Sequence, residues 1–187
     1  MSGIRTERLS LRPVTAADLA QVTEIQGDPA AARFRPGGAN TPDESASQLV
    51  AWVEHWRAHG FGYWAVEVTA TGALIGLGGL QHSEFDGERY LNLYYRFRPS
   101  SWGHGYAPEM ARAAMDLAAR QLPRLAVWIV TTVENTPARR VAEKLGFTEF
   151  REGMYAGALS RFYQWRGSGS STSGATSSTN ESNASSA

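Results

Sequence analysis

The segment Trp102-Gly103-His104-Gly105-Tyr106-Ala107 lies between a strand-like run that ends near Phe97 and a helix-like run that begins near Ala107. Two glycines in such a turn let the backbone approach a ligand without a Cβ atom in the way. The first turn of the helix adds unpaired amides and the positive end of the helix dipole. Together these features are typical of a site that binds a phosphate or a diphosphate.

Strand and helix patterns alternate on both sides of this segment. Upstream, residues 9–14 predict a strand, and Thr15 caps a first helix. A second helix begins after Thr41, where Glu44 completes a capping box, and ends at Gly60. Further strands are predicted at residues 63–68, 74–80, 90–97, 125–133, near 155 and at 161–165, with helices from about 107 and over 137–145. The order β-α-α-β-β-β-α-β-α-β-β indicates a mixed α/β sheet.

The composition excludes several classes of protein. The chain has 187 residues, 42% of them hydrophobic, which is enough for one buried core. Its 18 basic and 18 acidic residues form no basic stripe, so we expect no nucleic-acid partner. The absence of cysteine excludes disulfides, thiolate metal sites and a cysteine nucleophile. No apolar run approaches the about 20 residues of a membrane helix and the polar start is unlike a signal peptide, so we expect a cytoplasmic protein.

The composition changes abruptly after Arg166. Residues 167–187 are almost entirely Gly, Ser, Thr, Ala and Asn, with no aromatic or large aliphatic side chain. Such a segment cannot bury enough surface to offset the entropy of ordering it. We therefore predict one domain over residues 1–166 and a disordered Gly/Ser/Thr-rich tail over residues 167–187.

Two ligands that contain a diphosphate could fit the glycine segment. A dinucleotide site needs G-x-G-x-x-G after the first strand of a βαβ unit, but Pro108 holds the third position here and the segment lies past mid-chain. The segment instead resembles the signature of the GNAT superfamily of N-acetyltransferases, which is Arg or Gln, two residues, Gly, one residue, then Gly or Ala. Trp102 takes the first of these positions, Gly105 and Ala107 the others. With Glu109 two residues on, the form is similar to the ribosomal-protein-alanine acetyltransferase branch.

Two further blocks carry the same resemblance. Residues 135–147, which end in Leu-Gly-Phe, resemble the closing motif of the family, and residues 6–13 resemble the usual start of that branch. The blocks follow in the expected order over residues 5–166. The resemblance implies a GNAT-like acyl-CoA N-acyltransferase fold whose central sheet splays between the fourth and fifth strands. It also implies acetyl-coenzyme A as cosubstrate, an amine acceptor, and a monomer or a homodimer.

The resemblance assigns the cofactor site residue by residue. Backbone groups of the strand that ends at Phe97 would pair with the pantetheine arm, as an added strand would. Amides of the glycine segment would hold the diphosphate, and Asn135 would bind the pantetheine or its thioester end. The implied cofactor-binding residues are Tyr95, Arg96, Phe97, Trp102, Gly103, His104, Gly105, Tyr106, Ala107 and Asn135.

Three positions that usually serve catalysis in the family hold other residues here. Asn92 stands where a Glu base is common, Ala142 where a Tyr acid is common, and Ala138 where the branch often has Ser. The candidates that remain are Glu134, Tyr94 and Asn92 itself. Glu134 has a simpler interpretation as a solvated loop carboxylate, and Tyr94 as a core aromatic.

The acceptor and the metal content are less directly indicated. An α-amine, with a pKa of about 8, needs less help from a base than an alkyl amine, so the altered base position favours a protein N-terminus over a small amine. Acidic residues at 84, 86 and 88 could instead bind a cationic acceptor. His55 and His59 lie four residues apart, but no third ligand is evident, so no metal is expected. A catalytically silent coenzyme-A-binding module and a dinucleotide-dependent oxidoreductase remain as alternatives.

Overall fold

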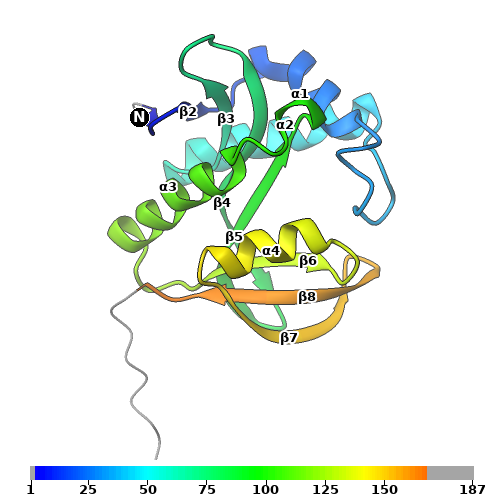
Figure 1. The fold of residues 1–187 in the computed structure, drawn as a ribbon, viewed down its shortest axis with the longest axis vertical. Helices are drawn as coiled ribbons and strands as arrows, with labels where there is room; N and C mark the ends of the chain where they lie inside the picture. The colour runs from blue at the N-terminus through cyan, green and yellow to red at the C-terminus, as the bar shows by residue number, and fades with distance from the viewer. Residues whose placement is uncertain (1–2, 168–187) are drawn as a thin grey trace, which may run out of the picture.

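The computed structural model describes residues 3–167 and has one eight-stranded sheet with helices on both faces (Figure 1). The strands lie in the order β1-β2-β3-β4-β5-β6-β8-β7. They are β1 (Ile4–Arg5), β2 (Leu9–Pro13), β3 (Tyr63–Val68), β4 (Leu74–Phe85), β5 (Glu88–Phe97), β6 (Val127–Thr132), β7 (Thr148–Tyr155) and β8 (Ala158–Trp165). The helices are α1 (Leu19–Gly27), α2 (Pro42–His59), α3 (Tyr106–Gln121) and α4 (Thr136–Lys144).

The predicted fold class and order of elements are confirmed. The structure adds the two-residue strand β1, which pairs with β2 and which the sequence pattern did not show. The predicted tail lies outside the described residues, apart from Gly167. No helix within residues 3–167 combines the length and the apolar character needed to cross a bilayer.

The limits of the first two helices follow from their caps. The Thr41 hydroxyl accepts a hydrogen bond from the Glu44 amide at 3.2 Å, and the Thr41 amide donates to the Glu44 carboxylate at 2.7 Å. Gly60 ends α2 with a φ of 72°. Helix α1 begins later than predicted, because the turn after Thr15 is a 3₁₀ helix and the α-helix starts at Leu19.

Alternation along the strands divides the core between the two faces of the sheet. Tyr63 and Ala65 pack with the helices α1 and α2, in a cluster that also contains Trp52. Trp64 and Val66 point the other way and join the cluster that holds α3 and part of α4. The helix pairs therefore sandwich the sheet.

Strands β5 and β6 separate soon after they meet. They pair in parallel at two positions, Leu91 with Val127 and Asn92 with Trp128. From there to Phe97, no strand of residues 3–167 pairs with β5 on that side. Figure 1 shows the consequence, an upper part built on β2 to β5 and a lower part of β6, β8, β7 and α4. The splay expected between the fourth and fifth predicted strands is confirmed. Because the other strand pairs described are antiparallel, the sheet does not match the parallel βαβ sheet of a dinucleotide fold.

Candidate functional site

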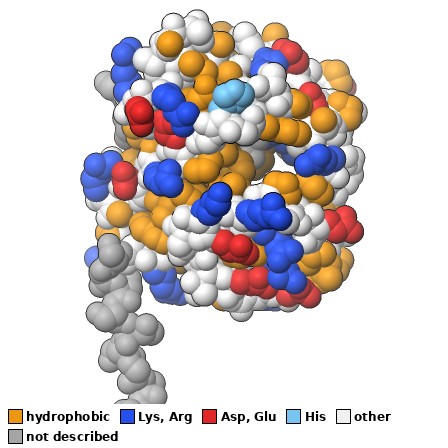
Figure 2. All heavy atoms as spheres, viewed as in Figure 1, with side chains coloured by type: hydrophobic (Ala, Val, Ile, Leu, Met, Phe, Trp, Pro, Cys, Tyr) orange, Lys and Arg blue, Asp and Glu red, His pale blue; other side chains and the backbone are white. Residues whose placement is uncertain are grey.

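The separation of β5 from β6 opens a cleft of about 830 Å³. Its walls come from these two strands, the glycine loop, the starts of α3 and α4, and the segment after α1. Figure 2 shows apolar side chains gathered in a hollow on this face, with Lys and Arg side chains beside it. Among residues 3–167, no Asp or Glu lines the cleft, whereas Arg33, Arg35 and Arg96 do.

The glycine loop forms one end of the cleft. Gly103 and Gly105 both have a φ of 78°, in the left-handed region that residues with a side chain rarely adopt. Gly105 is the N-cap of α3. Pro108 occupies the third helical position, where an N–H would have no helical partner, and the amides of Tyr106 and Ala107 belong to the same unpaired first turn. This geometry suits an anion, as the sequence predicted.

A partly buried carboxylate fixes the loop to the turn between β1 and β2. Glu109 accepts hydrogen bonds from the Thr6 hydroxyl at 2.6 Å, from the Arg8 amide at 2.8 Å and from the Arg8 guanidinium at 2.8 Å. Arg8 also donates to the His104 carbonyl at 2.8 Å. Burial by itself raises the pKa of Glu109, but these hydrogen bonds outweigh it and lower the pKa overall. These contacts join the turn at residues 6–8 to the start of α3, about a hundred residues away in the sequence.

The exposed edge of β5 forms the long wall of the cleft. The Leu91 amide donates to Ala126 at 2.9 Å, and the Phe97 carbonyl accepts from the Trp102 indole at 3.1 Å, so odd-numbered residues turn their backbone groups away from β4. Tyr95 therefore faces the cleft with its main chain. By the same alternation, Arg96 turns its main chain towards β4 and lines the cleft with its side chain.

Most of the cofactor-binding residues implied by the resemblance lie together. All of them line the cleft except His104. The His104 side chain is exposed, its ring stacks on Tyr106 with centroids 5.5 Å apart, and its Nδ1 contacts the Trp102 carbonyl at 2.9 Å. Asn135 caps α4, since its side chain accepts a hydrogen bond from the Ala138 amide at 3.2 Å.

A polar network lies on the opposite side of β5 from the glycine loop. Gln26, which is 2% exposed, donates to the Tyr94 hydroxyl at 2.9 Å and accepts from Arg96 at 2.6 Å. Burial raises the pKa of Tyr94, although Arg96 and Gln26 offset part of the shift. The rings of Trp52 and Tyr63 pack beside Tyr94, with centroids 6.2 and 5.0 Å away. The Tyr94 phenol therefore keeps its proton at neutral pH.

Sequence reasoning missed most of this network. Gln26 and the arginines at 33 and 35 lie in or just after an ordinary amphipathic helix, and no motif distinguishes them. Trp52 is both buried and part of the cleft wall. The segment after α1 reaches across to β6, where the Thr132 hydroxyl donates to the Phe34 carbonyl at 3.3 Å.

The three catalytic candidates lie in different surroundings. Tyr94 lines the cleft. The Asn92 amide donates to the Tyr63 hydroxyl at 2.7 Å and does not line the cleft, although it ends the paired part of β5. Glu134 is exposed and also lies outside the lining. Ala142, which stands where the family often has a Tyr acid, is fully buried, and its methyl group cannot donate a proton.

The acidic residues at 84, 86 and 88 lie at the tip of the hairpin that joins β4 to β5. None of them lines the cleft, and Asp86 forms an ion pair with Arg151 at 2.6 Å. Their position gives no support to the idea that they bind a cationic acceptor.

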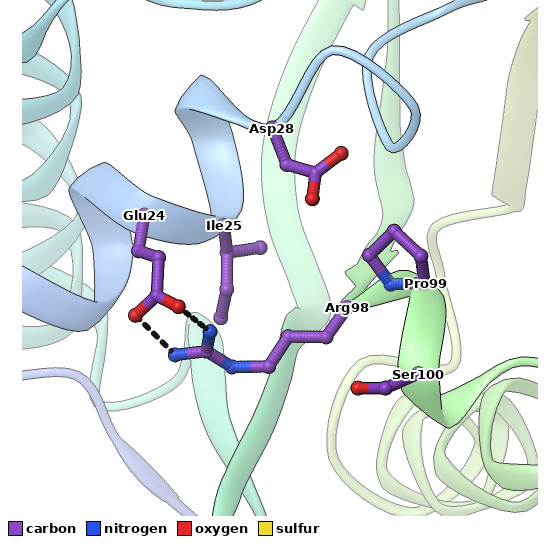
Figure 3. Close-up of a pocket in the computed structure, with 6 residues that line it drawn as sticks. All are labelled: Glu24, Ile25, Asp28, Arg98, Pro99 and Ser100. Carbon is purple, nitrogen blue, oxygen red and sulfur yellow. Dashed lines mark hydrogen bonds and ion pairs between the residues drawn. The ribbon is translucent and has the colours of Figure 1, made fainter.

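A second, smaller cavity of about 290 Å³ lies between α1 and the end of β5 (Figure 3). Its main polar feature is an ion pair between Arg98 and Glu24, which includes a hydrogen bond of 2.9 Å. Figure 3 shows the guanidinium facing the Glu24 carboxylate across the space below Ile25. The pair ties α1 to the end of β5, and we interpret this cavity as structural.

The structure also brings a third histidine, His82 of β4, to the pair formed by His55 and His59. The spacing along the sequence did not indicate this contact. Burial is the main cause that lowers the pKa of both His55 and His82.

Comparison with known proteins agrees with the fold and the cleft. The family model described as an acetyltransferase (GNAT) domain matches residues 8–148. The uncharacterized protein YkkB of Bacillus subtilis is 32% identical over 106 residues, which are 53% of this chain and 60% of that protein. The uncharacterized N-acetyltransferase YnaD of the same organism is 24% identical over 162 residues, which are 87% of this chain and 91% of that protein.

Solved structures share the architecture over nearly the whole described chain. An acetyltransferase from Agrobacterium tumefaciens has a TM-score of 0.78 and 25% identity, and the match covers 89% of this chain and 95% of that one. Two more distant structures contain coenzyme A. One is RimL, a ribosomal α-N-protein acetyltransferase (TM-score 0.69, 15% identity, 86% and 95% covered). The other is spermidine N-acetyltransferase from Vibrio cholerae with spermine (TM-score 0.65, 19% identity, 85% and 94% covered). The chain therefore belongs to the GNAT family, and it is an acetyl-coenzyme-A-dependent N-acetyltransferase.

Proposed function

We propose that the protein transfers the acetyl group to a primary amine by direct attack in a ternary complex, within the cleft between β5 and β6. The observation that carries this proposal is the unpaired edge of β5, which leads to the amides at the start of α3. An extended pantetheine arm could pair with that edge at Tyr95, and a diphosphate could meet the loop from Gly103 to Ala107. The hydroxyl of Tyr95 is buried and has no hydrogen-bond partner among residues 3–167, so it offers one more donor. We assign the activity to residues 1–166.

The charge of the cleft favours one class of acceptor. A polyamine would need carboxylates close to its cationic nitrogens, but the described lining contains arginines and no acidic residue. A peptide N-terminus followed by neutral or acidic residues places no further positive charge there. Its α-amine, with a pKa of about 8, is also partly neutral without a strong base. We therefore favour a protein or peptide α-amine over a polyamine.

The chemistry assigns a role to Tyr94. The neutral amine attacks the acetyl carbonyl carbon, a C–N bond forms, and the C–S bond breaks to release the thiolate of coenzyme A. The proton lost by the amine passes to water, Tyr94 supplies a proton to the thiolate, and the Tyr94 phenolate then regains a proton from water. Its raised pKa keeps the phenol protonated until that step.

The direct test is the release of free thiol from acetyl-coenzyme A over a panel of acceptors. The panel should pair peptides that have a free N-terminus with the same peptides blocked at the N-terminus, and should include spermidine. We expect release with free peptides and little with blocked peptides or spermidine. Preference for spermidine would overturn the acceptor class, and coenzyme A binding without release for any acceptor would overturn the proposed transfer.

A single substitution tests the role of the phenol. Tyr94→Phe should lower kcat by about 100-fold or more, since a general acid typically contributes about 10²- to 10⁴-fold. The dissociation constant of coenzyme A, measured by calorimetry, should stay within about 2-fold, because the donor side is untouched. An unchanged kcat would remove Tyr94 from the mechanism.

A further inference from the structure

Three of the four histidines of the chain meet away from the cleft. His55 and His59 lie on the last two turns of α2, and His82 lies on β4. The centroids of their rings are 4.5 Å apart for the helical pair, and His82 is 5.6 and 4.7 Å from His55 and His59. One ligand nitrogen of each ring lies within 4.8 Å of the others. Gln81, the neighbour of His82, lines the cleft, so alternation turns His82 to the other face of the strand.

The hydrogen bonds of His55 define which nitrogen is available. Its Nδ1 lies 2.9 Å from the Phe61 carbonyl, which can only accept, so Nδ1 carries the proton. The lone pair is then on Nε2, which faces the cluster and accepts a hydrogen bond of 3.2 Å from the His82 amide, a bond that an ion would have to replace. A histidine whose second nitrogen donates to a backbone carbonyl is the usual arrangement around a bound metal, because the carbonyl fixes the orientation of the ring.

The other two rings are free to bind. No hydrogen bond engages a ring nitrogen of His59 or His82 within the described residues, and Nδ1 of His82 is buried without a partner. His59 is exposed, which leaves a path from solvent. Three imidazoles from a helix and a strand thus surround one point.

We propose that His55, His59 and His82 form a binding site for a divalent transition metal ion such as Zn²⁺, with the fourth position open to water. Imidazole is a ligand that Zn²⁺, Ni²⁺ and Cu²⁺ accept. At a Zn–N distance of about 2.0 Å, tetrahedral nitrogens lie about 3.3 Å apart, so the rings of His59 and His82 rotate inwards and His55 exchanges its amide contact for the ion. The ion would fasten the end of α2 to β4. It would have no part in the acetyl transfer, and the site does not depend on the proposed acceptor.

The test is metal binding by the full chain, without an affinity tag and stripped of metal. Titration with ZnCl₂ by calorimetry should show one ion per chain and a higher Tm, since an ion that binds only the folded state stabilises it. Co²⁺ should give the visible absorption of a tetrahedral site. His59→Gln should weaken Zn²⁺ binding by about 10-fold or more, with its metal-free Tm unchanged because the side chain is exposed.

His104→Gln is the matched control, because it removes the one histidine outside the cluster. It should retain the stoichiometry and the affinity. His82→Gln should repeat the loss seen with His59→Gln, with folding checked by circular dichroism. The proposal is overturned if the wild type shows no saturable binding, or if His59→Gln binds as tightly as His104→Gln. In that event the three rings pack with Phe61 as a purely structural cluster.

Discussion

The two sides of the cleft are built in different ways. On the donor side, the glycine loop and the edge of β5 offer backbone groups, whose positions depend on φ angles and on a missing strand partner. On the side that we propose for the acceptor, Gln26, Tyr94 and Arg96 offer side chains, held to one another by hydrogen bonds between α1 and β5. Backbone sites require particular residues at fixed spacing, whereas side-chain sites can be assembled in many ways. This difference explains why the sequence carries a motif for the glycine loop and none for the network of Gln26, Tyr94 and Arg96.

The largest expected effect is the loss of coenzyme A affinity when a negative charge is placed in the glycine loop. Gly105→Asp places a carboxylate where the diphosphate is expected, and we predict that coenzyme A affinity falls by about 100-fold or more. The fold should persist, because Asp is among the residues that adopt a positive φ most readily and the nearest atom to an added Cβ is 3.5 Å away, at the end of the Arg8 side chain. Calorimetric titration with coenzyme A measures the loss.

Gly105→Asn is the control for that variant. Asparagine has the same size, tolerates a positive φ and carries no charge, so it should lose much less affinity than Gly105→Asp. Equal losses would show that backbone strain, not charge, is responsible, and unchanged affinity in Gly105→Asp would contradict the placement of the diphosphate.

The next effect concerns the support of the donor loop. Glu109→Gln removes the charge that holds Thr6 and Arg8, and should cost about 2 kcal/mol of unfolding free energy, as is typical of hydrogen bonds to charged groups. Coenzyme A affinity should fall with it, because the loop loses its tether at the His104 carbonyl. Chemical denaturation and calorimetry give the two values.

Glu109→Gln should also change how the stability of the protein depends on pH. The pKa of Glu109 is lower in the folded protein, so its contribution to stability is present above the unfolded value and is lost as the pH falls through the folded value. Glu109→Gln should therefore flatten the acid side of the Tm profile. A profile as steep as that of the wild type would assign acid sensitivity to other carboxylates.

A smaller effect is expected on the acceptor side. Arg96→Met keeps an unbranched aliphatic stem but removes the guanidinium and its bond to Gln26, and should raise the acceptor KM by about 10-fold. Coenzyme A affinity should change little, because the main chain of Arg96 faces β4 and not the cleft. Arg98→Met, two residues on, is the control, because Arg98 pairs with Glu24 outside the cleft. If both variants behave alike, the effect comes from the packing of α1 and not from the acceptor site.

The smallest effect is expected from Glu134. Its carboxylate is exposed and outside the cleft lining, so Glu134→Gln should change kcat by less than about 2-fold at any pH. Initial rates with a peptide acceptor test this expectation. A fall of about 10-fold would restore Glu134 as the base and would mean that the acceptor approaches from the β6 side.

The elements and the conformation of the glycine loop could be predicted from the sequence because both depend on local signals. The Thr41 cap, the glycines at 103 and 105, and the alternation along residues 63–68 each specify a conformation within a few residues. The Glu109 network and the contact of Gln26 with Tyr94 could not be predicted, since each joins segments at least 68 residues apart. The cluster of His82 with His55 and His59 was missed for the same reason.

The short pairing of β5 with β6 also lets the two halves of the sheet open separately. A ladder this short contributes little cooperativity between the halves, which are joined mainly through side chains such as Met110, Val127 and Tyr163 in one apolar cluster. Amide hydrogens on β6 and β8 can therefore exchange with solvent through an opening that leaves β2 to β4 intact. Acetyl-coenzyme A that pairs with β5 and contacts Asn135 would supply the hydrogen bonds that β6 does not make to β5. It would therefore slow amide hydrogen exchange on both halves together.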